Sequence, residues 1–288
     1  MIELMLMMAL CLSSLPEDAE TFWRERYLLL LGIEPELKPL PGELAEAACP
    51  PLRLLDYSLP IGRYTNAELE RNRRLYGEEE VMLSPKYVVL HYTVVDDAEA
   101  VLDLFSRPSN LPVGNQKPVK SLVTVHYMVD KDGAVLSLVP EDRRTSGTYG
   151  LDHRALAIEM VAKDEADLMS RPLQLLAGFC LIDGLLKKYD LPVWAVLSHQ
   201  DVAMGEVFLS DYTDLADTEY PYWYPKPQFR YDPGPTVMAW CREFLLRRRG
   251  LWSQHPVANM ERGPKPKPSP TATPSGTPRA KPSASAKP

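Results

Sequence analysis

The segment Ser121-Leu-Val-Thr-Val-His-Tyr-Met-Val-Asp-Lys-Asp-Gly-Ala-Val-Leu-Ser-Leu-Val139 does most to decide the fold class. Residues 121–130 alternate and are rich in β-branched side chains, and residues 134–139 return to the same character. Between them, Asp130-Lys-Asp-Gly133 has the chemistry of a tight turn. The pattern predicts a β-hairpin, which excludes a purely parallel sheet.

Predicted strands and helices alternate on both sides of this hairpin. Short apolar, β-rich segments predict strands at 87–95, 156–162 and 193–197. Longer segments, with capping residues or dense apolar positions, predict helices at 14–32, 65–76, 171–189 and 236–249. Residues 33–62 show no clear period, so we expect them to be irregular. The predicted class is α/β, a mixed β-sheet flanked by helices.

Changes in composition divide the chain into four parts. We expect an apolar start (1–13), a helical and irregular N-terminal extension (14–83), a main domain (84–250) and a disordered tail rich in Pro, Ser and Lys (251–288). Residues 263–288 hold eight of the 28 prolines and five Lys or Arg without any acid, a composition that buries too little apolar surface to fold. This basic tail is either a solubilising terminus or a segment that rests on anionic polymers.

Charge and cysteine usage narrow the class of protein. The formal net charge of −7 gives no reason to expect nucleic acid as a partner. Cys11, Cys49, Cys180 and Cys241 show no metal-finger spacing. Cys180 and Cys241 lie in apolar, helix-like segments, where we expect small buried thiols. The cysteines therefore do not identify a redox compartment.

Three potential metal ligands stand at the ends of predicted elements. His91 lies on the first strand of the main domain, His199 directly follows a later strand, and Asp232 precedes the last helix. Two neutral imidazoles and one carboxylate can hold zinc and leave a fourth position open, and Glu159 on a middle strand could then transfer protons. Each residue also has an ordinary interpretation, because a strand histidine is often a hydrogen-bonded core residue and a strand carboxylate is often an ion-pair partner.

Five short motifs occur in order between Ser84 and Arg249. They are His91-Tyr-Thr93 on a predicted strand, Val125-His-Tyr-Met-Val-Asp-Lys-Asp-Gly133 in the hairpin, Ala157-Ile-Glu-Met160 on the next strand, Ser198-His-Gln-Asp201 after a third, and Arg230-Tyr-Asp-Pro-Gly-Pro235 before the last helix. In this order they resemble the type-2 N-acetylmuramoyl-L-alanine amidases, which include the peptidoglycan recognition domains. The resemblance implies that residues 84–250 form an amidase domain.

The resemblance also implies an activity and roles for particular residues. It implies zinc-dependent hydrolysis of the amide bond between the lactyl group of N-acetylmuramic acid and L-alanine. His91, His199 and Asp232 would hold the zinc ion, and Glu159 would be the catalytic glutamate of the bacterial branch. Arg230 stands where that branch usually has a lysine; its guanidinium is still cationic and can stabilise an oxyanion, although its geometry differs.

Other positions depart from the family pattern. The phage lysozyme-type members use a tyrosine before the hairpin histidine, and this chain has Val125 there. The family often has a groove-lining Trp-His-x-Gly element after the hairpin, but residues 143–147 read Arg-Arg-Thr-Ser-Gly. This puts the substrate contacts in doubt, although not the metal site. His153 is expected to be a surface or loop-packing residue, and His126 is expected to pack in the core.

The segment between His199 and Asp232 is long and aromatic, and it predicts substrate contacts. Its Trp223 and Tyr224, together with Tyr92, are the candidate substrate residues, because aromatic faces suit stacking on sugars. The alternative is that about half of these aromatics only pack the insertion against the domain.

Two classes of function remain open on the sequence alone. One is the hydrolase, acting on peptidoglycan or released muropeptides. The other is a recognition module that binds muropeptides without cutting them, and such modules lack one or more zinc ligands. All three ligands and the glutamate are present here, so we favour the enzyme. Attachment to the cell wall is compatible with either as an additional role. The oligomeric state is not predicted.

The first 14 residues bear on location. Their apolar run of about ten residues is too short to span a membrane as a helix. It resembles the apolar part of a secretion signal, although Glu3 stands where a positive charge is usual. We favour the bacterial cell envelope, periplasmic or extracellular. The alternative is the cytoplasm, if the apolar start is not a signal, and a misassigned start would look the same.

Overall fold

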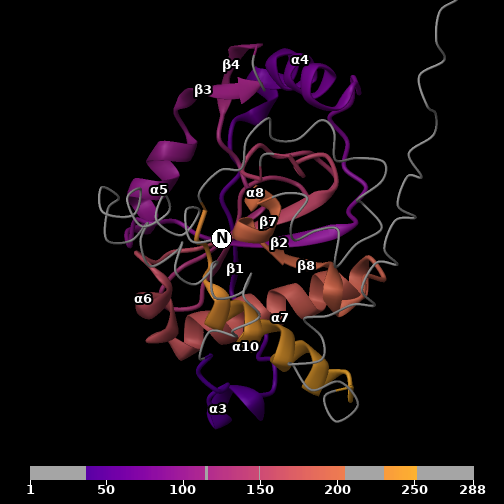
Figure 1. Cartoon of the computed structure of the whole chain (residues 1–288). Coiled ribbons are helices and arrows are strands. Elements are labelled where there is room, and N and C mark those ends of the chain that lie inside the picture. Colours follow the sequence, from indigo (N-terminus) through magenta and orange to yellow (C-terminus); the bar gives the residue numbers. More distant parts are fainter. Residues whose placement is uncertain (1–36, 114–115, 149, 205–229, 252–288) are drawn as a thin grey trace, which may run out of the picture.

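A six-stranded mixed sheet forms the centre of the fold (Figure 1). The computed structural model describes residues 37–113, 116–148, 150–204 and 230–251. The sheet order is β1-β6-β5-β7-β2-β8, in which β5 and β6 are antiparallel and every other neighbouring pair is parallel. The strands are β1 (Leu54–Asp56), β2 (Tyr87–Tyr92), β5 (Tyr127–Val129), β6 (Val135–Ser137), β7 (Ala155–Met160) and β8 (Val196–Ser198). The predicted fold class, a mixed α/β sheet with helices, is confirmed.

The predicted hairpin is present as β5 and β6. In its turn, the Gly133 N–H donates to the Asp130 carbonyl over 2.8 Å, and the Asp130 N–H donates to the Ala134 carbonyl over 2.8 Å. Gly133 has a φ of +81°, in the left-handed region that favours glycine. A Cβ at this position would also lie 3.1 Å from the Leu173 carbonyl oxygen, so both the turn and the helix beneath it require glycine.

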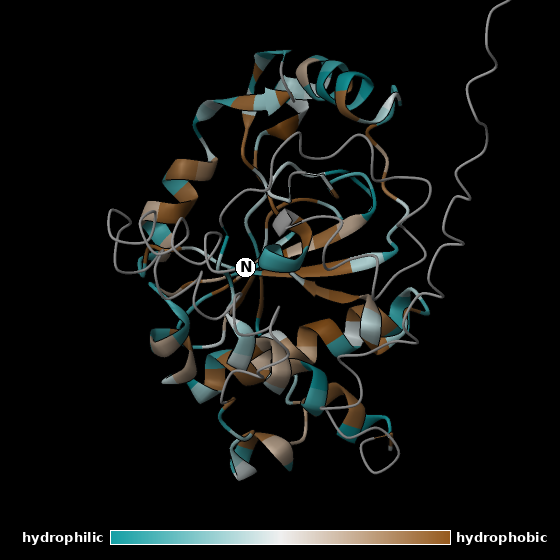
Figure 2. Cartoon of the chain, viewed as in Figure 1, coloured by the Kyte–Doolittle hydropathy of each residue, from teal (hydrophilic) through white to brown (hydrophobic). Residues whose placement is uncertain are grey.

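Helices cover both faces of the sheet. On one face, α7 (Pro172–Lys188) and α10 (Pro235–Arg248) contribute Phe179 and Phe244 to the same core as Leu90 and Ile158. On the other face, α5 (Ala98–Phe105) packs Phe105 into a second core that holds Met128 and Ala157. Figure 2 shows the central strands mostly brown and the more exposed α4 mostly teal. Within the described ranges, no helix has the length and apolar character needed to cross a bilayer.

Smaller elements complete the fold. A separate two-stranded antiparallel sheet lies beside α4, which packs on both of its strands. The remaining elements are α3 (Gly42–Ala45), the 3₁₀ helix η1 (Ile61–Tyr64), α4 (Thr65–Tyr76), β3 (Pro108–Val113), β4 (Gln116–Leu122), α6 (Glu165–Met169), the 3₁₀ helix η2 (Val193–Ala195) and α8 (His199–Met204).

Three predicted elements differ from those observed. The strand expected over 121–130 is two strands, because β4 ends at Leu122 and β5 begins at Tyr127. Between them, side chains replace part of the strand ladder: the Ser146 hydroxyl accepts from the Thr124 N–H over 3.1 Å, and the His126 ring accepts from the Ala157 N–H over 3.0 Å. Residues 193–195 form η2 before β8, and the segment 33–62, expected to be irregular, contains α3 and β1. The helix predicted at 14–32 lies outside the described residues.

The described part of the N-terminal extension, from residue 37 onward, is bound to the core of the domain. β1 pairs in parallel with β6, and the Trp240 ring N–H of α10 donates to the Lys38 carbonyl over 2.7 Å. Cys49 and Cys180 form a disulfide, so the prediction that Cys180 is a free buried thiol was wrong. Sequence spacing could not pair two cysteines 131 residues apart, because they meet only where α10 packs against both α3 and α7. Cys241 is a buried free thiol, as predicted.

Removing the disulfide should destabilise the protein without changing its fold. The bond closes a loop between residues 131 apart, so its loss in Cys49→Ala/Cys180→Ala restores chain entropy to the unfolded state. The free energy of unfolding should fall by about 2–4 kcal/mol, measured by urea denaturation. Cys241→Ala, which removes a buried thiol without a cross-link, is the control for lost side-chain volume. A double variant as stable as the oxidised parent would contradict the pairing, as would peptide mapping without a Cys49–Cys180 link.

Candidate metal and catalytic site

Two neighbouring parallel strands place His91 and Glu159 side by side. His91 on β2 is in direct register with Glu159 on β7. Because side chains alternate along a strand, and Leu90 and Ile158 face α7 and α10, His91 and Glu159 share the opposite face. Both residues lie near the carboxyl ends of their strands, where sites of α/β sheets gather.

His199 reaches the same edge from the other side of β2. β8 pairs in parallel with β2 and ends at Ser198, so His199 begins α8 directly at the sheet edge. The start of α8 is held reciprocally: the Ser198 N–H donates to the Asp201 carboxylate over 2.9 Å, and the Asp201 N–H donates to the Ser198 hydroxyl over 2.8 Å. This is a capping-box arrangement, and it gives the Ser198-His-Gln-Asp201 motif a local structural reason.

Asp232 comes from the turn before α10. Its carbonyl accepts from the Gln200 N–H over 3.2 Å, which holds the turn against α8. Glu165 of α6 accepts from the Thr236 and Val237 N–H groups, over 2.6 and 3.0 Å, and so caps α10 from outside. Gly234 has a φ of +98°, and a Cβ there would lie 2.3 Å from the Glu165 carboxyl carbon. Gly234 is therefore needed for Glu165 to reach the helix end beside Asp232.

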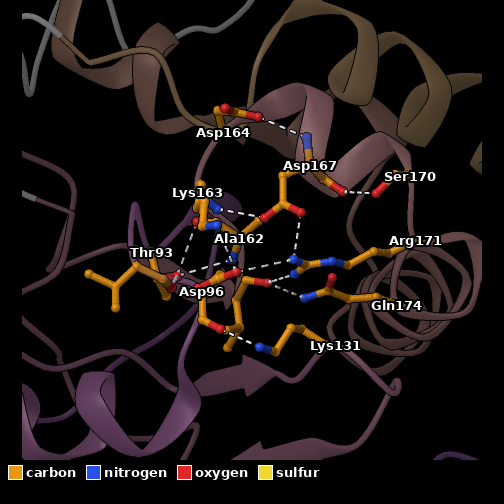
Figure 3. A network of polar contacts seen from close by, with 12 residues as sticks. Thr93, Asp96, Lys131, Ala162, Lys163, Asp164, Asp167, Ser170, Arg171 and Gln174 are labelled. Carbon is orange, nitrogen blue, oxygen red and sulfur yellow. Dashed lines mark hydrogen bonds and ion pairs between the residues drawn. The ribbon is translucent and has the colours of Figure 1, made fainter.

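A polar network fastens the strand ends that carry the site (Figure 3). The Thr93 hydroxyl, two residues after His91, accepts from the Ala162 N–H over 3.2 Å, so the ends of β2 and β7 are tied together. Gln174 of α7 donates to the Val129 and Val161 carbonyls, over 2.9 and 3.0 Å, and Arg171 donates to the Val161 carbonyl over 2.6 Å. The same network contains Asp164 and Asp167 around the start of α6, the helix that carries Glu165.

The three predicted ligands converge. The Asp232 Oδ2 lies 3.1 Å from the His91 Nδ1 and 3.0 Å from the His199 Nδ1. The two rings meet edge to face with centroids 4.4 Å apart. All three side chains are buried, and one ligand atom from each lies within 4.8 Å of the others. A buried set of two imidazoles and one carboxylate, without a cysteine, fits zinc with an open position.

The electrostatics of the site keep Asp232 ionised. Burial acts to raise the pKa of Asp232, but attraction to His199 and the hydrogen bonds with both imidazoles outweigh it and hold the pKa well below its usual range. Burial raises the pKa of Tyr92, and the charges of Asp232, Asp164 and Glu165 add to this effect. The Tyr92 hydroxyl therefore stays neutral beside the site.

Glu159 has the opposite character to Asp232. Burial raises its pKa to about 7, with His91 and Arg230 opposing the rise and Asp232 reinforcing it. Its Oε2 is buried and has no hydrogen-bond partner among the described residues. A carboxyl group with a pKa near neutrality and an unsatisfied oxygen is able to accept or donate a proton at physiological pH.

Other sequence-predicted residues have more varied positions. Arg230 is exposed, yet close enough to act on Glu159 through its charge. His126 is fully buried, its Nε2 donates to the Arg143 carbonyl over 2.9 Å, and burial lowers its pKa to about 4, so the predicted core role is confirmed. His153 stacks on Tyr76 with centroids 3.9 Å apart, which makes it a buried packing residue. Trp223 and Tyr224 lie outside the described residues.

Sequence reasoning missed Thr148, Asp152 and Glu165. The Thr148 hydroxyl lies 3.0 Å from the His91 Nε2, and Asp152 accepts from the Thr148 N–H over 2.7 Å. No motif marks Thr148 or Asp152. Glu165 follows Asp164 at a helix start and reads as an ordinary first-turn acid, although it caps a helix about 70 residues further along the chain.

Part of the chain is similar to a known family. Residues 82–214 match the family described as N-acetylmuramoyl-L-alanine amidase. This match confirms the resemblance that the ordered motifs predicted. The match ends before Asp232, so the third candidate ligand rests on the geometry. No curated protein matches the chain.

Solved structures with similarity to the chain include PlyL, LysC and AmpDH3. PlyL has 16 % identity and a TM-score of 0.35, with 54 % of this chain and 84 % of that chain covered. The amidase LysC from Clostridium intestinale has 17 % identity and a TM-score of 0.35, with 55 % and 87 % covered. AmpDH3 from Pseudomonas aeruginosa has 20 % identity and a TM-score of 0.38, with 58 % and 61 % covered. At these scores none of the three carries an argument about this chain.

The raised pKa of Glu159 predicts how stability depends on pH. Because its folded pKa is about 7 and its ordinary value is 4.5, folding favours the protonated form. This contribution is fully present below pH 4.5 and is lost as the pH rises through about 7. In metal-free protein, the loss between these pH values should be about 2–3 kcal/mol larger than in Glu159→Gln, measured by chemical denaturation.

The control is Glu99→Gln, because Glu99 is an exposed acid on α5. Its stability profile should follow that of the unsubstituted protein. Identical pH profiles for Glu159→Gln and the unsubstituted protein would show that Glu159 titrates normally.

Proposed function

We propose that this chain is a zinc-dependent N-acetylmuramoyl-L-alanine amidase, which hydrolyses the amide bond between the lactyl group of N-acetylmuramic acid and L-alanine. The observation that carries the proposal is the buried convergence of His91, His199 and Asp232 beside Glu159. The match of residues 82–214 to the N-acetylmuramoyl-L-alanine amidase family supports the choice of bond. The domain that performs the reaction would span residues 84–250.

His91, His199 and Asp232 would hold the zinc ion. When bound at such a site, zinc polarises the amide carbonyl and activates water as a nucleophile. Asp232 is suited to this role because it stays ionised, and because both imidazoles already point a ring nitrogen at its carboxylate. The fourth position would be left for substrate and water, since the described residues offer three ligands here.

Glu159 would move the proton. Its carboxylate takes a proton from the attacking water as the new C–O bond forms, and it delivers that proton to the alanine nitrogen as the C–N bond breaks. The products are the muramoyl carboxylic acid and a free α-amino group on the peptide. A pKa near 7 suits both halves of this exchange. Arg230 would face the negative charge that develops on the carbonyl oxygen, and Tyr92 would contact substrate at the end of β2.

A recognition module that binds muropeptides without cutting them is the alternative function. Such a module has no need for a proton-transfer group beside a complete ligand set. The Glu159 Oε2, which is buried without a partner among the described residues, favours the enzyme, because leaving a buried polar atom unsatisfied costs stability that binding alone would not require.

The location we propose is the cell envelope, periplasmic or extracellular. The Cys49–Cys180 disulfide supports this, because disulfides persist in oxidising compartments and are rare in the cytosol. Peptidoglycan and its soluble muropeptides are the proposed partners.

Glu159→Gln should separate chemistry from metal binding. The amide keeps the size of the side chain but cannot accept the proton, so turnover should fall by about two to four orders of magnitude while zinc content stays unchanged. The assay is mass spectrometry of products from digested sacculi, set beside soluble muropeptides, with metal analysis of the same samples. Glu99→Gln should retain both turnover and zinc. Near-normal turnover in zinc-replete Glu159→Gln would remove Glu159 from the mechanism, and intact substrate with the unsubstituted protein would favour the recognition module.

The aromatic insertion should form one wall of the substrate groove. This segment, Met204–Phe229, is flanked in the sequence by His199 and Asp232, and the side chains of these two residues meet at the site. Replacing Trp223 and Tyr224 together by Ala should therefore raise KM on muropeptide, because stacking faces for the glycan are lost. Steady-state kinetics and thermal unfolding of the same variant test this. An unchanged KM with a lowered Tm would mean that the two aromatics only pack the insertion.

A further inference from the structure

The loop between β6 and β7 is held by the N-terminal extension. The Leu83 N–H donates to the Asp142 carbonyl over 2.8 Å, and the Arg144 N–H donates to the Val81 carbonyl over 2.8 Å. The side chains continue this pairing, because arginines of the loop meet acids of the extension. The ion pairs are Arg143 with Glu68 at 2.7 Å, Arg154 with Glu78 at 2.8 Å, and Arg144 with Glu78.

This arrangement accounts for the departure at residues 143–147, where the family often has Trp-His-x-Gly. In this chain the two arginines of that segment are turned toward Glu68 and Glu78 of the extension. α4 ends at Tyr76, before the family match begins at residue 82. The contacts therefore join the matched part of the chain to α4, which carries Glu68, and to the segment after it, which carries Glu78.

The innermost of these contacts is fully enclosed. Arg71 of α4 forms an ion pair with Asp152 at 2.7 Å, and their side chains are 3 % and 0 % exposed. The Tyr76 hydroxyl donates to the same carboxylate oxygen over 3.2 Å. A buried ion pair is weak evidence for stability, since desolvation offsets much of the attraction. The ion pair with Arg71 does fix the position of the Asp152 carboxylate. This position matters for the loop, because the other Asp152 oxygen accepts from the Thr148 N–H over 2.7 Å.

Thr148 connects Asp152 to the ring of His91. Its hydroxyl oxygen lies 3.0 Å from the His91 Nε2, while the His91 Nδ1 points at Asp232. Thr148 is fully buried. If Nδ1 is to offer its lone pair to a metal, the ring must carry its hydrogen on Nε2, and the Thr148 hydroxyl is placed to accept that hydrogen.

We propose that α4 of the extension is a positioning element for the metal site, acting through Arg71, Asp152 and Thr148 on the ring of His91. The inference rests on the proposed zinc function. Thr148 selects the His91 tautomer and fixes the ring plane, Asp152 holds the Thr148 backbone, and Arg71 holds Asp152. The extension thereby contributes to zinc affinity without touching the metal.

The direct test is the zinc affinity of Thr148→Val and Thr148→Ser in the full chain. Valine keeps the shape of threonine but cannot accept from Nε2, so the zinc Kd from chelator competition should rise about 10- to 100-fold. Serine retains the hydroxyl and should stay near the unsubstituted value. In the zinc-loaded protein, where Nδ1 would hold the metal and Nε2 carries the hydrogen, ¹⁵N-resolved spectra should show this Nε2–H exchanging slowly with solvent in the unsubstituted and serine forms, and faster in the valine form, which lacks the accepting hydroxyl.

The remote part of the inference is tested by Arg71→Met against Arg248→Met. Arg248 pairs at 3.0 Å with Asp183, whose side chain is also 3 % exposed, at the end of α10 away from Asp232. Both variants remove an arginine from a buried aspartate, so both should lower Tm. Only Arg71→Met should also weaken zinc binding, by a few-fold to about tenfold, at a temperature where both remain folded.

The outcomes are distinguishable. An unchanged zinc Kd and an unchanged exchange rate of the His91 Nε2–H in Thr148→Val would overturn the role of Thr148 while leaving the zinc site intact. Equal changes in Kd for Arg71→Met and Arg248→Met would show that affinity follows overall stability, and would overturn the role of α4. An unsubstituted protein that binds no zinc would overturn the proposed function itself.

Discussion

The parallel pairing of β2 with both β7 and β8 is the constraint on which the site depends. Parallel neighbours end at the same edge, so His91, Glu159 and His199 meet there although they are far apart in the sequence. A shift of one residue in the β2–β7 register would turn His91 and Glu159 to opposite faces. The network around Thr93 and Gln174, which ties the strand ends to one another and to α7, therefore protects the geometry of the chemistry.

Two carboxyl groups in one site are held in opposite states by their surroundings. Asp232 lies within hydrogen-bond distance of two imidazoles and stays ionised, whereas the Glu159 Oε2 is buried without a hydrogen-bond partner among the described residues and the pKa of Glu159 is raised. Only an ionised Asp232 can serve as a ligand, and only a carboxyl group near neutrality can both take and return a proton. The separation of these roles follows from the number of donors that each carboxyl group meets, since both share the same sheet edge.

The described part of the N-terminal extension, from residue 37 onward, packs closely against the main domain. It adds β1 to the sheet edge, is joined to α7 by a disulfide, and meets the β6–β7 loop through a row of ion pairs. Most of these contacts are polar and depend on direction. They are therefore better suited to fixing the position of the loop than to burying apolar surface. The same loop contacts the metal site, because its Thr148 hydroxyl lies within hydrogen-bond distance of the His91 Nε2.

Much of this protein could be predicted from the sequence because its signals are local. The Asp130–Gly133 turn, the alternating strands and the apolar helix at 171–189 follow from backbone chemistry within a few residues, and the ordered motifs marked His91, Glu159, His199, Arg230 and Asp232. Only the tertiary structure decided which distant residues contact one another. These contacts are the Cys49–Cys180 disulfide, the capping of the start of α10 by Glu165, and the link from Arg71 to His91. These contacts join residues tens to more than a hundred positions apart, and no local pattern encodes which buried polar groups will meet once the sheet has closed its core.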